Sequence, residues 1–395
     1  MKIGIKLCIL LSLLVFLEGC WDRTELNDLA LVTAMSFDKG EHNEIITTVQ
    51  IVIPQNQGSG GSSGGVSGGS PHKTTIRSGA GVNISDSLSK LQQKTPRKLF
   101  WGQCKIFIFS EDIAKAGMRD EFDFLARHPQ PRERANIFVS KGKAAQTLEL
   151  FPPIENNSSE VLRKLTDFKI GYKVTLQELS KMLRGEAGAA AIPIVLILPK
   201  AKSAEPFQTI PYIMGTALLK RDKMIGQISG KTTHGMKWIL NEVDEFTVTF
   251  KVAGNEGLVS LKPVKAKVKL LPQIVDGKWK MKIKVKATGS LIQNGTAMDS
   301  TNPRLLRKME KAFGQDIKVR IEQALIEVQH KNKTDILGFA EAFHRKFPQQ
   351  WEKNKERWDE LFPGVEVSID VAASILRSGL INAPGGIPED EVVAK

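Results

Sequence analysis

The chain has 395 residues, and its 41% of apolar and 25% of charged residues are typical of globular proteins with buried cores. At about 100–200 residues per domain, two or three domains are expected. The formal net charge is +13, but the basic residues are spread out and form no nucleic-acid-binding motif. This basic excess favours an anionic membrane surface over nucleic acid, and a merely solvated basic surface is the remaining alternative.

The first nineteen residues are typical of a secretion signal. Two lysines precede an apolar run over residues 7–17 that is too short to span a bilayer. The run ends in Leu17-Glu18-Gly19-Cys20, which resembles a lipobox except at Glu18, where a small or apolar residue is usual. We predict that residues 1–19 are removed and that Cys20 becomes the lipidated N-terminus, the alternative being an ordinary signal with an incidental cysteine. The diacylglycerol added to a lipobox cysteine has two acyl chains, which hold a protein on a membrane far longer than one chain does.

A search for catalytic or cofactor motifs finds none. Cys104 is the only cysteine beyond Cys20, so no intramolecular disulfide is possible, and its strand-like setting predicts a buried core thiol. The six histidines lack metal-ligand spacing. The segment Gly226–Thr232 resembles a phosphate loop but is one residue short between its glycines, which favours a strand, a turn and a helix beginning at Thr232 or Thr233. We therefore predict no catalytic residue, no metal and no cofactor.

Residues 20–150 are predicted to form an N-terminal α+β domain. The Gly- and Ser-rich stretch over residues 58–70 cannot bury apolar area and is expected to be a flexible loop between two strands. Asn83 or Ser85 is the expected cap of the helix that follows. Strands are predicted over residues 30–37, 45–53, 74–76, 107–109 and 135–139, and helices over residues 84–93, 113–117, 121–126 and 143–150.

Residues 151–207 are predicted to form a small subdomain and connector, because two prolines after Phe151 break the pattern. Helices are expected over residues 159–166 and 175–183. The apolar stretch over residues 189–198 is too short to cross a membrane and contains Pro193, so it indicates a buried strand.

Residues 208–382 are predicted to form a C-terminal α+β domain, followed by a disordered tail over residues 383–395. A helix from Pro303 to Val328, capped by Thr301 or Asn302, shows an apolar stripe that suits packing on a sheet. Other helices are expected over residues 341–347 and 349–361, and strands over residues 216–220, 223–226, 246–252, 258–271, 279–288 and 365–375. Because neither half alternates regularly between strand and helix, the fold class is α+β, multidomain, with mixed or antiparallel sheets and helices on their faces.

Lysines alternate with apolar residues along two of these strands. Lys265, Lys267 and Lys269 belong to the first, and Lys282, Lys284 and Lys286 to the second. The pattern predicts a half-buried antiparallel sheet with one lysine-rich face. Such a face usually means solvent exposure and edge protection, and the alternative is a surface that meets a membrane or a partner.

The residues around Cys20 carry a resemblance to a known family. The run from Gly19 to Ala30 reads Gly-Cys-Trp-Asp-Arg-Thr-Glu-Leu-Asn-Asp-Leu-Ala and is similar to the start of the Ger(x)C family, the lipoprotein C subunits of spore nutrient germinant receptors. Departures are Glu18 and the run Gly102-Gln103-Cys104, where a His-containing variant is expected in many relatives. Further similar segments are Ile106–Ala114, Arg127, Arg132, Arg134, Lys141–Ala144, Asp335–Phe339, Trp351 and Trp358, so that the resemblance covers nearly the whole chain.

The resemblance implies a non-enzymatic subunit of a nutrient germinant receptor, anchored through Cys20 to lipid on the outer face of the spore inner membrane. Its expected partners are two integral membrane subunits, which it would scaffold or couple for nutrient-triggered germination. The residues expected near the membrane and partners are Trp21, Asp22, Arg23, Glu25 and Asn27. The alternative for this motif is internal, with Asp22 or Thr24 capping a helix and Trp21 packed on the body.

Two other functions remain open at this point. A solute-binding lipoprotein that captures nutrient directly would need a cleft between two α/β lobes, and the irregular strand order argues against it. An envelope hydrolase would need paired carboxylates or an activated nucleophile, and no sequence pattern indicates either. Direct binding of a small molecule is therefore not expected.

Overall fold

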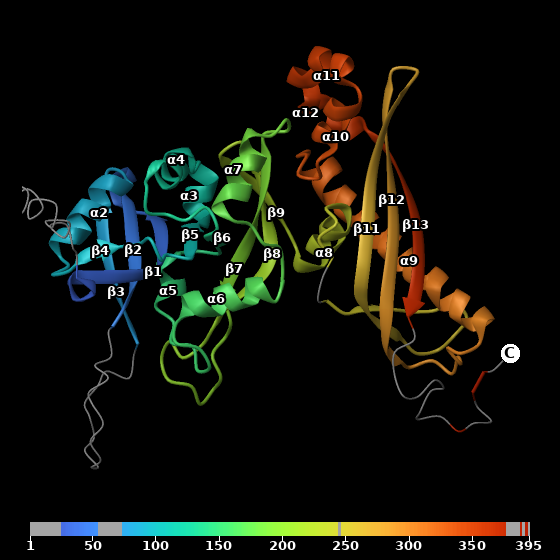
Figure 1. Ribbon diagram of the computed structural model, residues 1–395, viewed down its shortest axis with the longest axis horizontal. Helices are drawn as coiled ribbons and strands as arrows, with labels where there is room; N and C mark the ends of the chain where they lie inside the picture. The colour runs from blue at the N-terminus through green and yellow to red at the C-terminus, as the bar shows by residue number, and fades with distance from the viewer. Residues whose placement is uncertain (1–24, 54–72, 244–245, 377–387, 389–391, 394–395) are drawn as a thin grey trace, which may run out of the picture.

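A computed structural model describes residues 25–53, 73–243, 246–376, 388 and 392–393. Two β-sheets lie side by side along the longest axis of the molecule (Figure 1). The first has nine strands in the order β3-β2-β1-β5-β6-β7-β8-β9, with β4 paired to β1, and the second has the order β10-β11-β12-β13. Helices pack on both sheets, so the predicted α+β class is confirmed.

The first sheet is mixed. Its centre, from β1 through β5 and β6 to β7, is parallel, and its outer pairs are antiparallel. All five residues of β5 and of β6 are buried, as expected for apolar strands covered on both faces. The strands are β1 (Leu29–Lys39), β2 (Ile45–Val52), β3 (Thr74–Gly81), β4 (Lys98–Phe100), β5 (Ile106–Ser110), β6 (Asn136–Ser140), β7 (Ala189–Ile197), β8 (Pro211–Lys220) and β9 (Lys223–Ile228).

Short capped helices cover this sheet. Asn83 accepts a hydrogen bond from the Asp86 amide at the start of α2, which confirms one of the two predicted caps. Thr175 and Glu178 form a capping box on α7. The helices are α2 (Ile84–Gln93), α3 (Glu111–Ala116), α4 (Arg119–Arg127), α5 (Ala145–Leu148), α6 (Ser158–Asp167) and α7 (Leu176–Arg184), with 3₁₀ turns η1 (Leu26–Asp28) and η2 (Glu41–Asn43).

A long hairpin dominates the second sheet. The strands β11 (Val259–Val275) and β12 (Lys278–Asn294) join through Asp276 and Gly277, both at positive φ, the conformation that a tight hairpin turn needs. The edge strand β13 (Glu366–Leu376) runs parallel to β12, and the short β10 (Val248–Phe250) pairs with β11.

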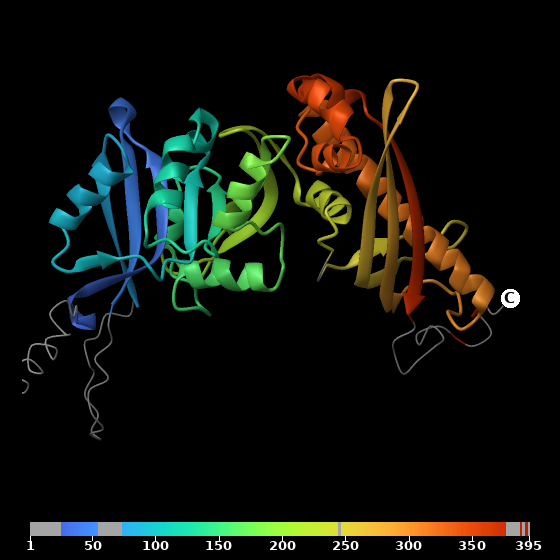
Figure 2. The same ribbon diagram turned by 45° about the horizontal axis from the view of Figure 1, so that its top comes forward.

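Helix α9 (Pro303–Leu325) lies across one face of the second sheet (Figures 1 and 2). Its cap is Asn302, and its predicted apolar stripe is buried, including Met309, Phe313 and Ile317. The chain continues as a π-helical segment η3 (Ile326–Lys331), then α10 (Phe339–Lys346), α11 (Pro348–Asn354), η4 (Lys355–Arg357), α12 (Trp358–Leu361) and η5 (Phe362–Gly364). The single helix predicted over residues 349–361 is thus broken into three short pieces.

One helix, α8 (Gly230–Ile239), joins the two sheets. Its cap is Ser229, whose hydroxyl accepts from the Thr232 amide, so the prediction of Thr232 or Thr233 as the start was wrong. Ser229 directly follows β9, and its side chain can accept this bond. The helix therefore begins earlier in the sequence than predicted. The predicted strand and helix at this phosphate-loop-like segment are present, but no glycine turn separates them, because Gly226 lies within β9 and Gly230 begins α8.

The first sheet does not stop at residues 150 or 207, where we predicted domain boundaries. Strands β7, β8 and β9 extend it to Ile228. Below, the first unit means residues 25–228, and the second unit means residues 246–376. The division of the chain into domains stays a prediction, and residues 1–24, the whole Gly/Ser stretch and most of the tail lie outside the described residues.

Cys104 is buried, as predicted, and its thiol donates to the Ile106 carbonyl at 3.3 Å. Burial raises the pKa of this thiol to about 12. A cysteine with so little thiolate is not a nucleophile, so Cys104 serves the core.

Candidate functional site

The N-terminal segment enters the body at η1. Of the residues predicted near membrane and partners, Glu25 and Asn27 are described and exposed, and Cys20, Trp21, Asp22 and Arg23 lie outside the described residues. The chain then passes into β1, a central strand of the first sheet. At roughly 3.5 Å per residue, Cys20 can lie at most about 17 Å from Glu25. Lipid on Cys20 would therefore keep this end of the body close to the bilayer.

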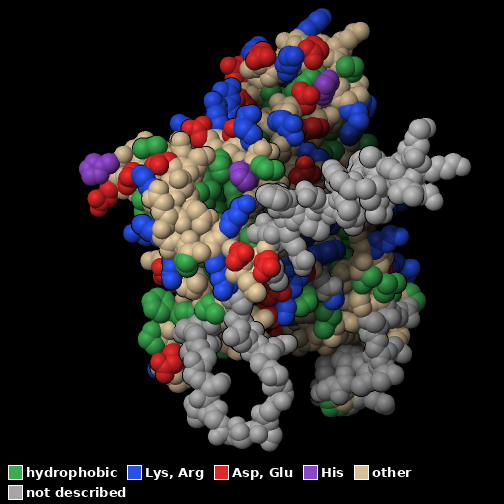
Figure 3. All heavy atoms as spheres, turned by 60° about the vertical axis from the view of Figure 1, so that its left-hand side comes forward, with side chains coloured by type: hydrophobic (Ala, Val, Ile, Leu, Met, Phe, Trp, Pro, Cys, Tyr) green, Lys and Arg blue, Asp and Glu red, His purple; other side chains and the backbone are tan. Residues whose placement is uncertain are grey.

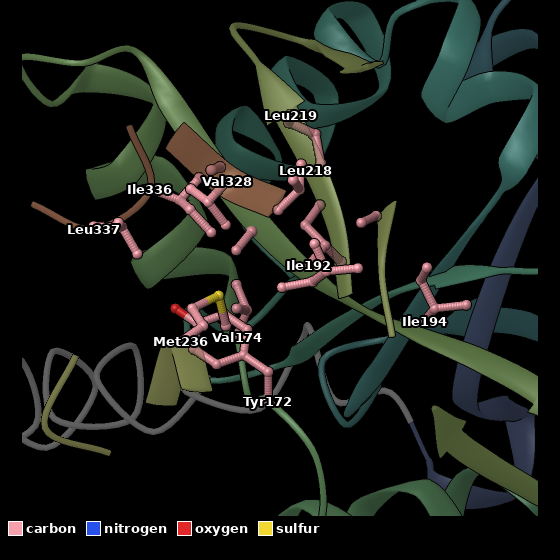
Figure 4. Packing of buried hydrophobic residues seen from close by; sticks show 14 of the residues in the cluster. Tyr172, Val174, Ile192, Ile194, Leu218, Leu219, Met236, Val328, Ile336 and Leu337 are labelled. Atoms are coloured by element: carbon pink, nitrogen blue, oxygen red, sulfur yellow. The ribbon is translucent and has the colours of Figure 1, made fainter. Parts of the chain in front are cut away.

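The two units meet in an apolar junction, shown in Figure 4. Ile192 and Leu218 from β7 and β8 face Met236 of α8 and, from the C-terminal part of the chain, Val328 and Leu337. These residues are all buried and belong to one continuous core cluster that extends through both sheets. No layer of water separates the units here, so each restrains the position of the other.

Buried polar contacts fix the position of α8 relative to the first unit. Lys237 of α8 is only 4% exposed, and its amine donates to the carbonyls of Lys169 and Gly171 at 3.1 and 2.9 Å. The hydroxyls of Thr216 in β8 and Thr233 in α8 lie 2.9 Å apart. Both contacts tie α8 to the first unit.

The other side of α8 meets α9 at close range. A Cβ atom added to Gly235 would lie 2.1 Å from the Arg320 carbonyl oxygen, so only glycine allows this approach of the two helices. Trp238 is fully buried, and its ring packs against those of Phe246 and Phe313. Helix α8 is therefore held from both units at once.

Glu186, in the loop before β7, makes a second tie between the units. Its carboxylate lies 2.8 Å from His344 Nδ1 and accepts from the Trp351 indole at 2.9 Å. Trp351 is fully buried, so Glu186 supplies the partner for a nitrogen that water does not reach. An ion pair between Lys220 and Asp359 lies in the same interface.

Asp335 organises the helices on the C-terminal side of this tie. It is 4% exposed and accepts from the amides of Leu337, Phe339 and Ala340 and from the Trp358 indole. Burial outweighs these four donors and raises the pKa of Asp335.

Trp351 and Trp358 are both buried, with ring centroids 5.1 Å apart, so the predicted core packing of the two indoles is confirmed. Their spacing of seven residues predicted a shared face, but not the carboxylates that hold their indole nitrogens. Glu186 lies far from Trp351 in the sequence, and Asp335 lies outside the helix that contains Trp358.

The predicted lysine-rich face is present on β11 and β12. Lys267 lies opposite Lys286, and Lys269 lies opposite Lys284, all four exposed. Alternate residues such as Ile283 point into the core. This is the side of the sheet that α9 does not cover (Figure 1).

A hollow of about 1090 Å³ lies between α2, α3 and α4 in the first unit. Its wall carries both signs of charge, including Arg119, Asp120, Asp123 and Arg127. Glu121 is largely buried there, and burial raises the pKa of its carboxyl. In Figure 3, which brings the first unit forward, acidic and basic side chains are intermingled over the visible face. The hollow belongs to the first unit alone and is not a cleft between two lobes.

Two features, a metal-binding cluster and a membrane-spanning helix, are absent from the described part of the chain. Its His, Cys, Asp and Glu side chains do not gather in groups of three that could hold a metal ion. Of its helices, none combines the length and the apolar character needed to cross a membrane.

Comparisons with known proteins match almost the whole chain. The family model described as Spore germination protein N-terminal domain matches residues 22–197, and the model described as Spore germination B3/GerAC like, C-terminal, matches residues 214–379. Spore germination protein KC of Bacillus subtilis (strain 168) is 28% identical over 400 residues and covers 97% of each chain. Spore germination protein B3 of the same organism is 22% identical over 394 residues, covering 96% of this chain and 100% of the relative.

A solved structure, that of the GerBC protein, has the same fold. Its TM-score is 0.55 at 19% sequence identity, and the match covers 87% of this chain and 96% of the other. Fold and junction thus define a multidomain α+β protein built on two joined sheets. The chain belongs to the GerAC family of spore germination proteins, which confirms the family predicted from the residues after Cys20.

The tie through Glu186 leads to a first prediction. Glu186→Ala should lower the free energy of unfolding by about 1–3 kcal/mol, because it leaves the Trp351 indole buried without an acceptor. Glu186→Gln keeps an acceptor oxygen and should recover most of the loss. Urea denaturation of the three proteins measures both changes. If the Ala variant is as stable as the parent, the tie does not stabilise the junction.

The partly buried ring of His234 in α8 leads to a second prediction. It stacks on Phe246, and burial, with Lys237 and Arg320 nearby, lowers the pKa of His234 to about 4. The unfolded chain binds this proton below pH 6.5 and the folded chain only below about 4. Stability should therefore fall by about 1–2 kcal/mol as the pH decreases through this window, a value reduced for partial exposure of the ring.

His234→Phe keeps the ring contact and should remove this part of the pH dependence. Thermal melts between pH 7.5 and 4.5 measure it, and His330→Gln, at an exposed position of η3, is the matched control. Parallel pH curves for the parent and His234→Phe would contradict the assignment.

Proposed function

We propose that this protein is the lipid-anchored C subunit of a spore nutrient germinant receptor and acts as a scaffold that couples two integral membrane subunits. The observation that carries the proposal is the lipobox-like run ending at Cys20, placed a few residues before a central strand of a germination-family fold. In this proposal the body lies on the outer face of the spore inner membrane. A lipid anchor raises its local concentration beside the other subunits, so modest interfaces suffice.

The junction supports a coupling role. Its apolar core, the buried contacts of Lys237 and the tie through Glu186 oppose a change in the relative position of the units. Partners bound to different units would therefore be held at a set separation. A scaffold needs this property, and an enzyme of two moving lobes would need the opposite.

A non-enzymatic role agrees with the side chains of the described residues. Cys104 is buried with a raised pKa, and the acidic side chains of the first-unit hollow stand beside Arg119 and Arg127. The buried carboxylate of Asp335 already accepts hydrogen bonds from helix amides and from an indole.

The anchor leads to a third prediction. Cys20→Ala should release the protein from spore membranes and abolish nutrient-triggered germination, because no acyl chain then holds it at the bilayer. Membrane fractionation, germination by loss of optical density, and mass spectrometry of the mature N-terminus measure the three parts. Thermal melts should match the parent, since Cys20 precedes the described body.

Cys104→Ala is the control, because it removes the other body cysteine and leaves the anchor. It should remain in the membrane fraction. A parent protein whose Cys20 is unmodified, or which is shed freely into the medium, would end the proposal.

The alternative of direct nutrient capture is tested by a fourth prediction. Isothermal titration of the chain with amino acids and sugars should show no binding heat at millimolar ligand, because the space between the units is filled by apolar side chains. The hollow in the first unit is large enough for such a ligand, but its wall is lined largely by charged and polar side chains, unlike a typical small-molecule pocket. Tight binding without partners would favour a solute-binding lipoprotein.

A further inference from the structure

The outer face of the second sheet concentrates positive charge. Every charged residue of β11 and β12 is a lysine, and the lysines alternate with the residues that pack into the core shared with α9. We define the lysine face as the exposed side chains of Lys265, Lys267, Lys269, Lys284 and Lys286. On a sheet these side chains stand about 4.8 Å apart between strands and about 7 Å apart along a strand.

The register sets like charges against each other. Lys267 is the direct cross-strand neighbour of Lys286, and Lys269 that of Lys284. Like charges directly opposite one another destabilise a sheet. Their repulsion is retained in the folded chain, and bound negative charge would relieve it. The arrangement is therefore poised to bind negative charge.

Counter-charges on the neighbouring strand reach only the edge of the lysine face, where Asp370 is the cross-strand neighbour of Lys284. On β13, Glu366 pairs with Lys280 at 2.8 Å, and Asp370 lies 3.5 Å from Lys282. Both lysines stand at the half of β12 next to the hairpin turn. Beyond them, β13 presents Ala372 and Ser374 beside Lys286 and Thr288. The acidic residues thus neutralise one end of the strand and leave the lysine face positive.

We propose that the lysine face binds the anionic headgroups of the membrane bilayer. The proposal rests on the proposed function for one point only, the presence of the chain at a membrane. Binding would lay the β11–β12 hairpin flat on the bilayer with α9 on the side away from it. The two sheets lie at opposite ends of the long axis (Figure 1), so attachment at Cys20, a few residues before the first sheet, and at the lysine face would hold both ends of the body at the membrane.

The chemistry of the face favours lipid over a protein partner. Protein hot spots centre on buried aromatic residues and arginine, whereas the members of this face are all lysine, with Thr288 and Ser374 beside them. A lysine is a mobile point charge that follows a fluid array of phosphates, and arginine is the residue suited to a fixed bidentate contact. Each lysine near an anionic bilayer strengthens binding by about fivefold.

The test uses the full chain with Cys20→Ala, so that any attachment comes from the body. Sedimentation is measured with vesicles of phosphatidylcholine and with vesicles containing 30% phosphatidylglycerol, a composition we choose as about the anionic content of a bacterial membrane. We expect binding only to the anionic vesicles, and at least tenfold weaker binding when salt is raised from about 0.1 to about 0.5 M.

The variant carries Lys267→Gln, Lys269→Gln, Lys284→Gln and Lys286→Gln. It should bind anionic vesicles at least tenfold more weakly, and its Tm should not fall, because the change removes cross-strand repulsion. The matched control carries Arg304→Gln, Arg307→Gln, Lys308→Gln and Lys311→Gln, which remove the same charge from the exposed side of α9. It should keep the parent affinity within about twofold.

Three results would overturn the proposal. These are no binding of the parent chain to anionic vesicles, equal losses in the face variant and the α9 control, and an unchanged face variant. The last, together with lost crosslinking of the face variant to the membrane subunits, would assign the face to a protein partner. The tested chain carries Cys20→Ala. Its binding to vesicles therefore does not depend on whether the anchor and the receptor role are confirmed.

Discussion

The burial of the C-terminal half of α8 on all sides is the constraint on which the rest of the molecule depends. From Gly235 to Ile239 every residue is buried, including Lys237, whereas a surface helix exposes one face. A helix can be buried in this way only if both units pack on it. Its position therefore fixes the first sheet against the second.

A lysine at the centre of such a helix is stable only if its charge is paired or hydrogen-bonded. Two carbonyls in the loop that follows α6, those of Lys169 and Gly171, accept from it. The same contact gives direction to a junction that apolar packing alone would leave free to slide, because dispersion contacts have little angular preference and hydrogen bonds have strong preference. Packing thus supplies stability, and Lys237 supplies a defined relative placement.

The elements with strong local signals could be predicted from the sequence, and those decided by distant contacts could not. The stripe of α9, the cap at Asn83 and the lysine alternation of β11 and β12 all follow from periods of 3.6 or 2 and from capping chemistry. Strand β4, only three residues long, and the π-helical segment after α9 have no such period, and both were missed. The first sheet also continues past the boundary predicted near residue 150, because prolines can break a local pattern without ending a sheet.

The candidate site divides in the same way. The family resemblance proposes an anchor at Cys20, which stays a prediction, and marks Asp335 and the two tryptophans, but Glu186 carries no local signal. Its partners lie 158 and 165 residues further along the chain, and only the folded junction brings them together.

The lysine face lies between these two cases. Its period of two is visible in the sequence and predicts which face is charged. Whether lysine stands opposite lysine depends on the register, which is set by the turn at Asp276 and Gly277 and by the shift between Pro263 and Lys265. A register moved by one residue would place Lys267 opposite the inward-facing Val285 or Ala287 and would send one strand's charges into the core. The buried residues that alternate with the lysines therefore enforce the same register that brings the like charges together.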